Sequence, residues 1–219
     1  MNKNIKLRLA GACCLAIIAF AGSAEHGFAR QSLSGQSLVD ALRRGGYNIY
    51  FRHAATDWSQ DDHVTVAGEW TSCDPKKMRQ LSNAGRAAAR RIGEAVRRLK
   101  IPIGRVLTSE YCRTRQTAEQ MDIGTVIPTR AIMNMRVAEM VGGREAVIER
   151  AQRELGRLPK PGTNTVLVAH GNLMQAASGA YTGEAGAGIF KPLGGSDFQL
   201  VAMLEPEDWQ QLADQFAHR

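Results

Sequence analysis

The chain has 219 residues, of which 44% are apolar and 22% are charged, and its formal net charge is +7. This length and composition are typical of one globular domain with a full core, and they argue against a disordered chain. The sequence has no repeat of roughly 20 to 50 residues, which excludes a solenoid. Its basic residues do not cluster with aromatic ones, so a nucleic-acid-binding protein is not expected either.

The amino terminus has the three parts of a secretory signal peptide. A basic start, an apolar run and a group of small residues follow one another: Lys3, Lys6 and Arg8, then residues 9–21, then Gly22, Ser23 and Ala24. We predict a signal peptide at residues 1–24, with cleavage after Ala29 as an alternative, and a single domain at residues 25–219. The apolar run is shorter than the roughly 20 residues of a membrane span, which disfavours a retained anchor. Lipid modification of Cys13 is a weaker option.

Export changes how charge and cysteines are interpreted. Loss of residues 1–24 removes three basic and no acidic side chains, so the net charge falls from +7 to +4. The mature protein is then expected in the periplasm or outside the cell, with no stable membrane span. Cys73 and Cys112 remain as an even pair in an oxidising compartment, and we predict a disulfide between them. Two buried unpaired thiols are the alternative.

The hydrophobic pattern alternates between strands and helices along the chain. Helices are expected at residues 36–45, 82–100, after 109, 145–158, from 171 to 180 and from 206 onward; strands at residues 49–51, 105–108, 125–127, 165–169 and 198–204; and a long surface loop at residues 57–80. In the helix that Ser82 caps, the expected apolar stripe is Ala84, Ala88, Ile92, Ala95, Val96 and Leu99. The alternation predicts an α/β fold, a three-layer α/β/α sandwich with a mainly parallel central sheet.

Three of the expected strands end in polar side chains. They are followed by Arg52-His53, by Ser109 to Arg113, and by His170-Gly171-Asn172. The carboxyl ends of parallel strands meet at one edge of a sheet, so two histidines and two arginines are expected to surround one anion. A guanidinium offers a planar fork of donors to phosphate oxygens, which indicates phosphoryl chemistry.

These segments resemble the three sequence blocks of the histidine phosphatase superfamily, which contains cofactor-dependent phosphoglycerate mutases and many phosphatases. Arg52-His53-Ala54-Ala55-Thr56 resembles the signature Arg-His-Gly-x-Thr. Residues 109–118 are similar to Ser-Pro-Leu-x-Arg-Ala-x-Gln-Thr-Ala, with Arg113 at the arginine. Residues 168–172 resemble the third block, in which a second histidine follows a buried strand. The blocks occur in the expected order and cover nearly the whole mature chain.

The resemblance implies a phosphoglycerate mutase-like fold and a two-step phosphoryl transfer. His53 would attack phosphorus and form a phosphohistidine, which water then hydrolyses. Arg52, Arg113 and His170 would stabilise the charge on the phosphoryl oxygens, and Thr56 and Asn172 would add neutral donors. No metal or other cofactor is implied, and the remaining histidines are scattered: His26, His63 and His218.

The proton donor to the leaving group is less defined. Family members often use a glutamate about 25 residues after the second arginine in a Leu-Asn-Glu context, whereas this chain has Met133-Asn134-Met135. Glu139 is our first choice because its spacing is close. The alternatives are Asp57, Asp61 and Glu184.

The sequence thus predicts an exported, metal-independent phosphomonoester phosphatase. Ser59 and Glu110 depart from the mutase-like pattern, and the chain has no room for the long insertion of mutases, which favours a phosphatase. The expected substrate is a small phosphorylated molecule, with a sugar or a lipopolysaccharide-core phosphate as candidates. The alternatives are a non-catalytic phosphate- or anion-binding protein on the same fold and a phosphohistidine-protein phosphatase.

Overall fold

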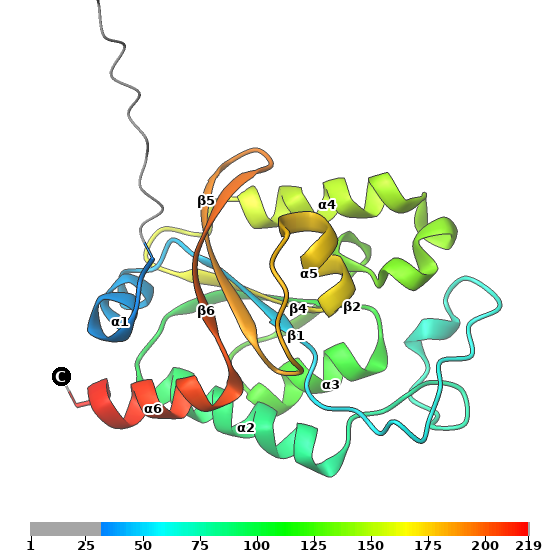
Figure 1. Cartoon of the computed structure of the whole chain (residues 1–219), viewed down its shortest axis with the longest axis horizontal. Helices are drawn as coiled ribbons and strands as arrows, with labels where there is room; N and C mark the ends of the chain where they lie inside the picture. Colours follow the sequence, from blue (N-terminus) through cyan, green and yellow to red (C-terminus); the bar gives the residue numbers. More distant parts are fainter. Residues whose placement is uncertain (1–31, 219) are drawn as a thin grey trace, which may run out of the picture.

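The computed structural model describes residues 32–218 (Figure 1). The predicted signal peptide, both of its cleavage sites and Cys13 lie outside the described residues. The helices are α1 (Gly35–Arg44), α2 (Asn83–Arg98), α3 (Cys112–Met121), α4 (Arg144–Gly156), α5 (Gly171–Ser178) and α6 (Pro206–Phe216). The strands are β1 (Asn48–Arg52), β2 (Ile103–Ser109), β3 (Val126–Thr129), β4 (Asn164–Ala169), β5 (Ala187–Gly194) and β6 (Asp197–Leu204). Short 3-10 helices complete the order: η1 (Glu69–Thr71), η2 (Arg130–Ile132) and η3 (Met135–Val141).

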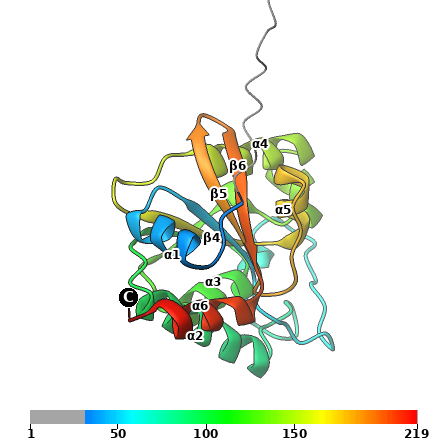
Figure 2. The ribbon, with the colours of Figure 1, turned by 60° about the vertical axis from the view of Figure 1, so that its left-hand side comes forward.

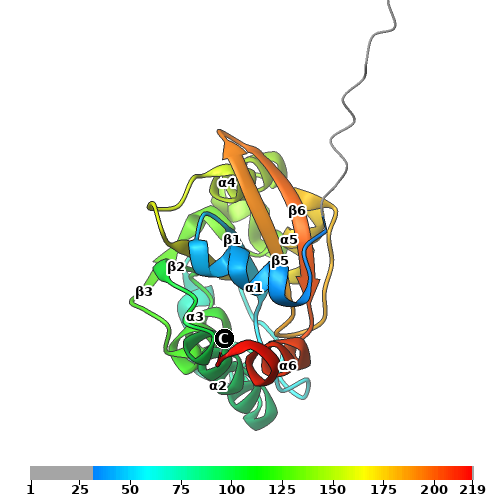
Figure 3. The same cartoon turned by 90° about the vertical axis from the view of Figure 1, so that its left-hand side faces the viewer.

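All of these strands belong to one sheet, in the order β3-β2-β4-β1-β5-β6. β1, β2, β3 and β4 are parallel to their neighbours within this group, whereas β5 is antiparallel to both β1 and β6. Figures 2 and 3 show β5 and β6 running side by side, with α4 and α6 on opposite sides of the sheet. The predicted three-layer α/β/α sandwich with a mainly parallel sheet is confirmed.

Each face of the sheet buries its own apolar cluster. On β1, Ile49 and Phe51 point to the face that α1, α2, α3 and α6 cover, and Tyr50 points to the face of α4 and α5. β4 alternates in the same way, with Val166 on the first face and Leu167 on the second. A strand that is buried on both faces needs apolar residues at every position, and this explains the unbroken apolar run of β4.

Two expectations were wrong in detail. β5 was not predicted, because Pro192 and the glycines at its ends are turn formers, and only pairing with β1 and β6 makes the segment a strand. The apolar stripe of α2 is also displaced in its first half. Ala84 is exposed and Ala88 half-buried, while Gly85, Ala89 and Gly93 are buried. At Gly85 and Gly93 the helix backbone itself lies against neighbouring segments, namely residue Ala55 and residue Met121.

Gly93 allows α2 and α3 to touch. A Cβ at this position would lie only 1.7 Å from the carbonyl oxygen of Met121. We expect Gly93→Ala to lower the free energy of unfolding by about 2 to 3 kcal/mol, because overpacking outweighs the gain of about 1 kcal/mol in helix propensity. Urea denaturation measures this. The control Glu94→Ala, exposed on the same helix, should stay within about 0.5 kcal/mol of wild type; equal stability of both variants would contradict the close contact.

Candidate active site

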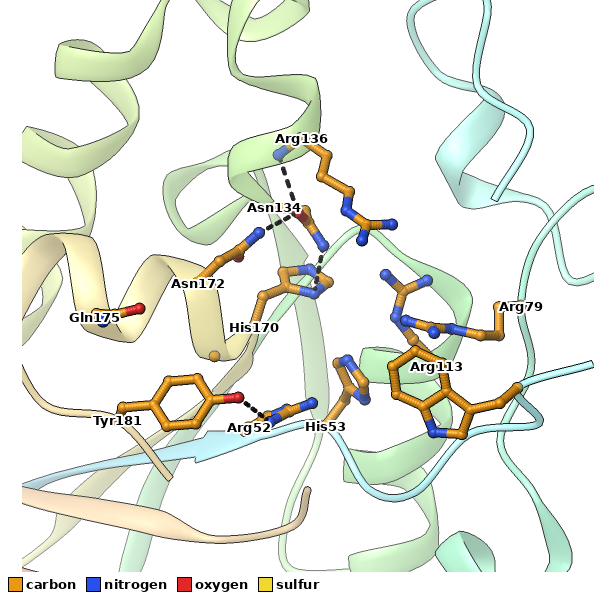
Figure 4. Close-up of a pocket in the computed structure, with 12 residues that line it drawn as sticks. Arg52, His53, Arg79, Arg113, Asn134, Arg136, His170, Asn172, Gln175 and Tyr181 are labelled. Carbon is orange, nitrogen blue, oxygen red and sulfur yellow. Dashed lines mark hydrogen bonds between the residues drawn. The ribbon is translucent and has the colours of Figure 1, made fainter. Parts of the chain in front are cut away.

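Three neighbouring strands end at one edge of the sheet and bring polar residues together there. β1, β4 and β2 are adjacent and parallel, and the register pairs Arg52 with Ala169. The next residues, His53 and His170, therefore leave the sheet at the same level, and the His53 backbone N–H donates to the carbonyl of Ala169. The centroids of the two imidazole rings are 5.6 Å apart (Figure 4). The structure thus unites the two histidines that the sequence pattern placed at one edge.

His53 is held in the form that a nucleophile needs. Its side chain is buried, and Nδ1 lies 3.0 Å from the carbonyl oxygen of Ala54. A carbonyl oxygen only accepts hydrogen bonds, so Nδ1 carries the proton and Nε2 keeps a free lone pair. Burial, and next the charge of Arg113, lowers the pKa of His53 well below 6.5. The ring is therefore neutral at pH 7.

His170 is buried too, and both of its ring nitrogens have protein partners. Nδ1 lies 3.0 Å from Nδ2 of Asn134, and Nε2 lies 2.9 Å from the hydroxyl of Ser109. Oδ1 of Asn134 accepts the backbone N–H of Arg136 and the amide of Asn172, so Nδ2 must face the ring. An amide nitrogen only donates, which makes Nδ1 the bare nitrogen and gives the proton to Nε2. Burial is the main cause that lowers the pKa of His170 well below 6.5.

Two arginines flank the rings, and each has a carboxylate partner. Nη1 of Arg113 lies 2.9 Å from Oδ1 of Asp62, and this ion pair is almost fully buried. Nη2 of Arg52 lies 4.0 Å from Glu184, and its Nη1 donates to the hydroxyl of Tyr181 at 2.9 Å. Both guanidiniums line the same cavity as the histidines, where their remaining donors are available to an anion.

A cavity of about 180 Å³ lies over the two rings (Figure 4). We call its buried part the floor: His53, His170 and Arg113, whose exposed fractions are 4%, 1% and 1%. We call four further lining residues the rim: Trp58, Arg136 and Tyr181, which are exposed, and Arg79, which is half-buried. The remaining lining residues are Arg52, Asn134, Gly171, Asn172 and Gln175. The two imidazoles thus lie at the buried end of the cavity, and two further arginines lie nearer to solvent.

Sequence reasoning missed the whole rim, as well as Asn134 and Gln175. Asn134 and Arg136 stand in the segment that was compared with the Leu-Asn-Glu context of the family, and that comparison was a signal for them. Trp58 and Arg79 come from the loop of residues 57–80, whose length is typical of a functional loop but whose lack of periodicity gave no signal for individual residues.

The neutral donors expected from the sequence have different positions. Asn172 lines the cavity and supports Asn134. Thr56 does not line it: its hydroxyl donates to Glu184 at 3.2 Å, and its backbone forms a bridge with Leu81.

The candidate proton donors are also spread over the structure. Glu139 is exposed on η3, and Asp61 is exposed in the loop. The carboxylate of Asp57 accepts hydrogen bonds from Ser59 and Gln60, and those from Ser59 are the main cause that lowers its pKa. Among the described residues that line the cavity, none is a carboxylate. Glu184 is the candidate that contacts a cavity residue, Arg52.

The loop of residues 57–80 is fastened to the start of α3. A disulfide joins Cys73 to Cys112 with a Cα–Cα distance of 5.3 Å, which confirms the predicted pairing. Three further contacts link the same two segments: Asp62 with Arg113, the Trp70 indole N–H with Glu110 at 2.8 Å, and the Thr71 carbonyl with Arg115 at 2.6 Å. The loop is therefore a fixed wall of the cavity.

The part of the chain that the structure describes has no helix long and apolar enough to cross a membrane. Within residues 32–218, no group of three or more His, Cys, Asp or Glu side chains is placed to hold a metal ion. His63 and His218 are exposed, and His26 lies outside the described residues.

A mainly parallel sheet that ends in two buried histidines between arginines defines an α/β protein with a site suited to a phosphoryl group. Residues 49–157 match the model of the histidine phosphatase superfamily, branch 1. The chain belongs to this superfamily, as its three sequence blocks predicted, and membership indicates phosphatase or mutase chemistry. Among curated proteins, none matches the chain in sequence.

Several solved structures are similar in fold. The SixA protein from Agrobacterium tumefaciens is 16% identical, with a TM-score of 0.47 over 74% of this chain and 98% of that one. The protein histidine phosphatase SixA with tungstate is 15% identical, with a TM-score of 0.49 and coverage of 74% and 98%. Phosphoglycerate mutase from Thermus thermophilus is 18% identical, with a TM-score of 0.49 and coverage of 73% and 98%.

The lowered pKa values predict the titration of both histidines. In the folded protein, His53 and His170 should protonate below pH 6.5, and in urea both should return to an ordinary value of about 6.5. Because the folded state then binds fewer protons than the unfolded state, the free energy of unfolding should fall as the pH drops from 6.5 towards the folded pKa values. NMR of the imidazole protons, assigned with His53→Ala and His170→Ala, measures this. Midpoints at or above 6.5 would contradict the buried neutral pair.

The disulfide predicts a measurable contribution to stability. It closes a loop of 39 residues, so Cys73→Ala/Cys112→Ala should lower the free energy of unfolding by about 3 to 4 kcal/mol. Amide hydrogen exchange should accelerate most in residues 57–80, and reduced wild type should behave like the double variant. If amide exchange in residues 57–80 of the double variant is as slow as in wild type, the non-covalent contacts alone hold the loop in place.

Proposed function

We propose that the protein is an exported phosphatase that hydrolyses phosphomonoesters through a phosphohistidine on His53. The observation that carries this proposal is the hydrogen bond between Nδ1 of His53 and the Ala54 carbonyl, which leaves the lone pair on Nε2 in a buried, neutral ring. A neutral imidazole with a fixed tautomer is the reactive form of a histidine nucleophile.

In the first step, Nε2 of His53 forms a bond to phosphorus as the bond from phosphorus to the leaving oxygen breaks. Arg52 and Arg113 stabilise the charge on the transferring oxygens, since positioning and electrostatics do most of the work in phosphoryl transfer. The leaving oxygen takes up a proton and departs as an alcohol. In the second step, water attacks phosphorus, the bond to Nε2 breaks and inorganic phosphate leaves.

His170 acts in this proposal as a fixed polar neighbour of the nucleophile. Hydrogen bonds with Asn134 and Ser109 hold the ring from both sides and orient it, with its centroid 5.6 Å from that of the His53 ring, and burial keeps it neutral. Asn172 supports this arrangement through Asn134 rather than through a separate contact with the ring. Because His170 is neutral, the positive charge next to His53 comes from Arg113 and Arg52.

Proton donation to the leaving oxygen is assigned here to Glu184. Its carboxylate lies 4.0 Å from Arg52, which lines the cavity, and its side chain is only 20% exposed. Glu139, the first choice from the sequence, is exposed on η3.

Export is supported by the signal-peptide pattern at residues 1–24 and by the disulfide, which persists in oxidising compartments. A periplasmic or secreted location follows from that proposal. The small cavity fits a small phosphorylated substrate, for which sugar phosphates and lipopolysaccharide-core phosphates are candidates.

Release of phosphate from 4-nitrophenyl phosphate tests the activity. The wild-type mature protein should turn over, and His53→Ala should lose at least about 1,000-fold in kcat. The matched control is His63→Ala, which removes an exposed histidine of the loop of residues 57–80 and should leave kcat at the wild-type value. An acid quench should trap phosphate on His53. Phosphate binding without turnover would instead support an anion-binding protein, and turnover of phosphohistidine peptides alone would support a phosphohistidine-protein phosphatase.

The proton donor is tested with leaving groups of different basicity. Glu184→Gln should lower kcat for an alkyl phosphate by about 100-fold or more, and less for 4-nitrophenyl phosphate, whose leaving group needs little protonation. The same two substrates are measured with Glu139→Gln. If Glu139→Gln gives the leaving-group-dependent loss and Glu184→Gln does not, the assignment to Glu184 fails.

A further inference from the structure

The rim of the cavity carries two arginines, Arg79 and Arg136, that the proposed phosphoryl transfer leaves without an assigned role. We propose that Arg79 and Arg136 bind a second anionic group, a phosphate or a carboxylate, on the leaving portion of the substrate. This inference rests on the proposed function and names a substrate class for it: phosphomonoesters whose leaving portion is itself negatively charged.

Burial places the leaving portion at the rim. The nucleophile His53 lies on the floor, together with Arg113 and His170, so the scissile phosphate must enter to this depth. The rest of the substrate then extends towards solvent. Arg136 is exposed there and Arg79 half-buried, and Figure 4 shows both guanidiniums on the same side of the cavity.

The charges of the rim and of the floor are balanced differently. On the floor side, Arg113 pairs with Asp62 and Arg52 with Glu184. Within residues 32–218, neither Arg79 nor Arg136 forms an ion pair, and the Arg136 side chain has no hydrogen-bond partner. Asp62 and Glu184 act on Arg79 by their charge, but within the described residues no carboxylate oxygen lies within 4.0 Å of either rim guanidinium.

Arg79 is held in place although it lacks such a partner. Its guanidinium lies over the indole ring of Trp58, 4.1 Å from the centroid. Its backbone N–H donates to Asp62, and its Nε is buried without a hydrogen-bond partner. A buried N–H without an acceptor is costly, and an anionic oxygen in the cavity would satisfy it.

The position of Arg79 is fixed by the rest of the loop as well. The disulfide and the Asp62–Arg113 ion pair fasten residues 57–80 to α3. Arg136 belongs to a different segment of the chain, the start of η3, where Asn134 accepts its backbone N–H. Two guanidiniums from independent segments thus converge on one end of a small cavity.

Matched substrates that differ in one charge test this inference. The first pair is 4-carboxyphenyl phosphate and 4-carbamoylphenyl phosphate; the second is propane-1,3-diol bisphosphate and propane-1,3-diol monophosphate. If the rim binds the anionic group of a pair, kcat/KM for phosphate release should be at least about 10-fold higher for the compound that carries this group than for its partner. A 10-fold difference corresponds to about 1.4 kcal/mol. The two pairs distinguish a carboxylate from a phosphate.

Arg79→Gln and Arg136→Gln should each reduce this ratio to near 1, while Arg91→Gln should keep the wild-type ratio. Arg91 is exposed on α2 and outside the cavity, which makes it the matched control. A ratio near 1 in wild type for both pairs, or an unchanged ratio in both rim variants, would overturn the inference.

Calorimetry with the His53→Ala protein separates this inference from the proposed function. Without turnover, the charged member of a pair should still bind about 10-fold more tightly than its partner, and Arg79→Gln in the same background should remove the difference. Preferential binding without turnover in wild type would refute the phosphatase and keep the anion subsite. Turnover by wild type, together with equal binding of the charged and uncharged compounds by His53→Ala, would support the phosphatase and refute the anion subsite.

Discussion

The structure depends on two neutral imidazoles that are buried among positive charges. His53 and His170 sit at the ends of adjacent parallel strands, and the register of β1 with β4 sets their distance. Both rings are buried, so protonation of either one would place a further charge beside Arg113 in a medium of low polarity. Hydrogen bonds from fixed partners then define which nitrogen of each ring is bare. The neutral tautomer of each ring is therefore set by the structure itself.

The same floor explains why the loop of residues 57–80 is fastened so firmly. Arg113 needs a partner while the cavity holds no anion, and Asp62 of this loop supplies it. The disulfide, the Trp70–Glu110 contact and the Arg115 contact hold the loop against the helix that carries Arg113. Glu110, a departure from the proline of the family pattern, is one of these fastening groups. Preorganised donors need little rearrangement when charge develops, and this makes electrostatic stabilisation effective.

The cavity also separates the chemistry from the choice of substrate. The floor consists of residues from the three family blocks, and its contacts suit any phosphoryl group. The rim consists of residues from the loop and from segments outside those blocks, and under the proposed function it would face the part of the substrate that differs between phosphomonoesters. Trp58 and Tyr181 give this rim exposed aromatic surface, with exposed fractions of 67% and 58%. Selectivity is therefore expected to evolve at the rim without disturbing the histidine pair.

The sequence by itself determined the α/β fold, the family, the meeting of His53 with His170 and the pairing of Cys73 with Cys112. Each of these follows from a local pattern combined with a general rule, because parallel strands share one carboxyl edge and an even pair of exported cysteines tends to oxidise. Tertiary structure alone decided the rest. Pairing with its neighbours made a strand of the segment around Pro192, and loop packing brought Arg79 to the cavity. Thr56 was turned towards Glu184, and Glu139 was left in solvent. Such positions depend on contacts between residues far apart in the chain, and no periodicity in the sequence encodes them.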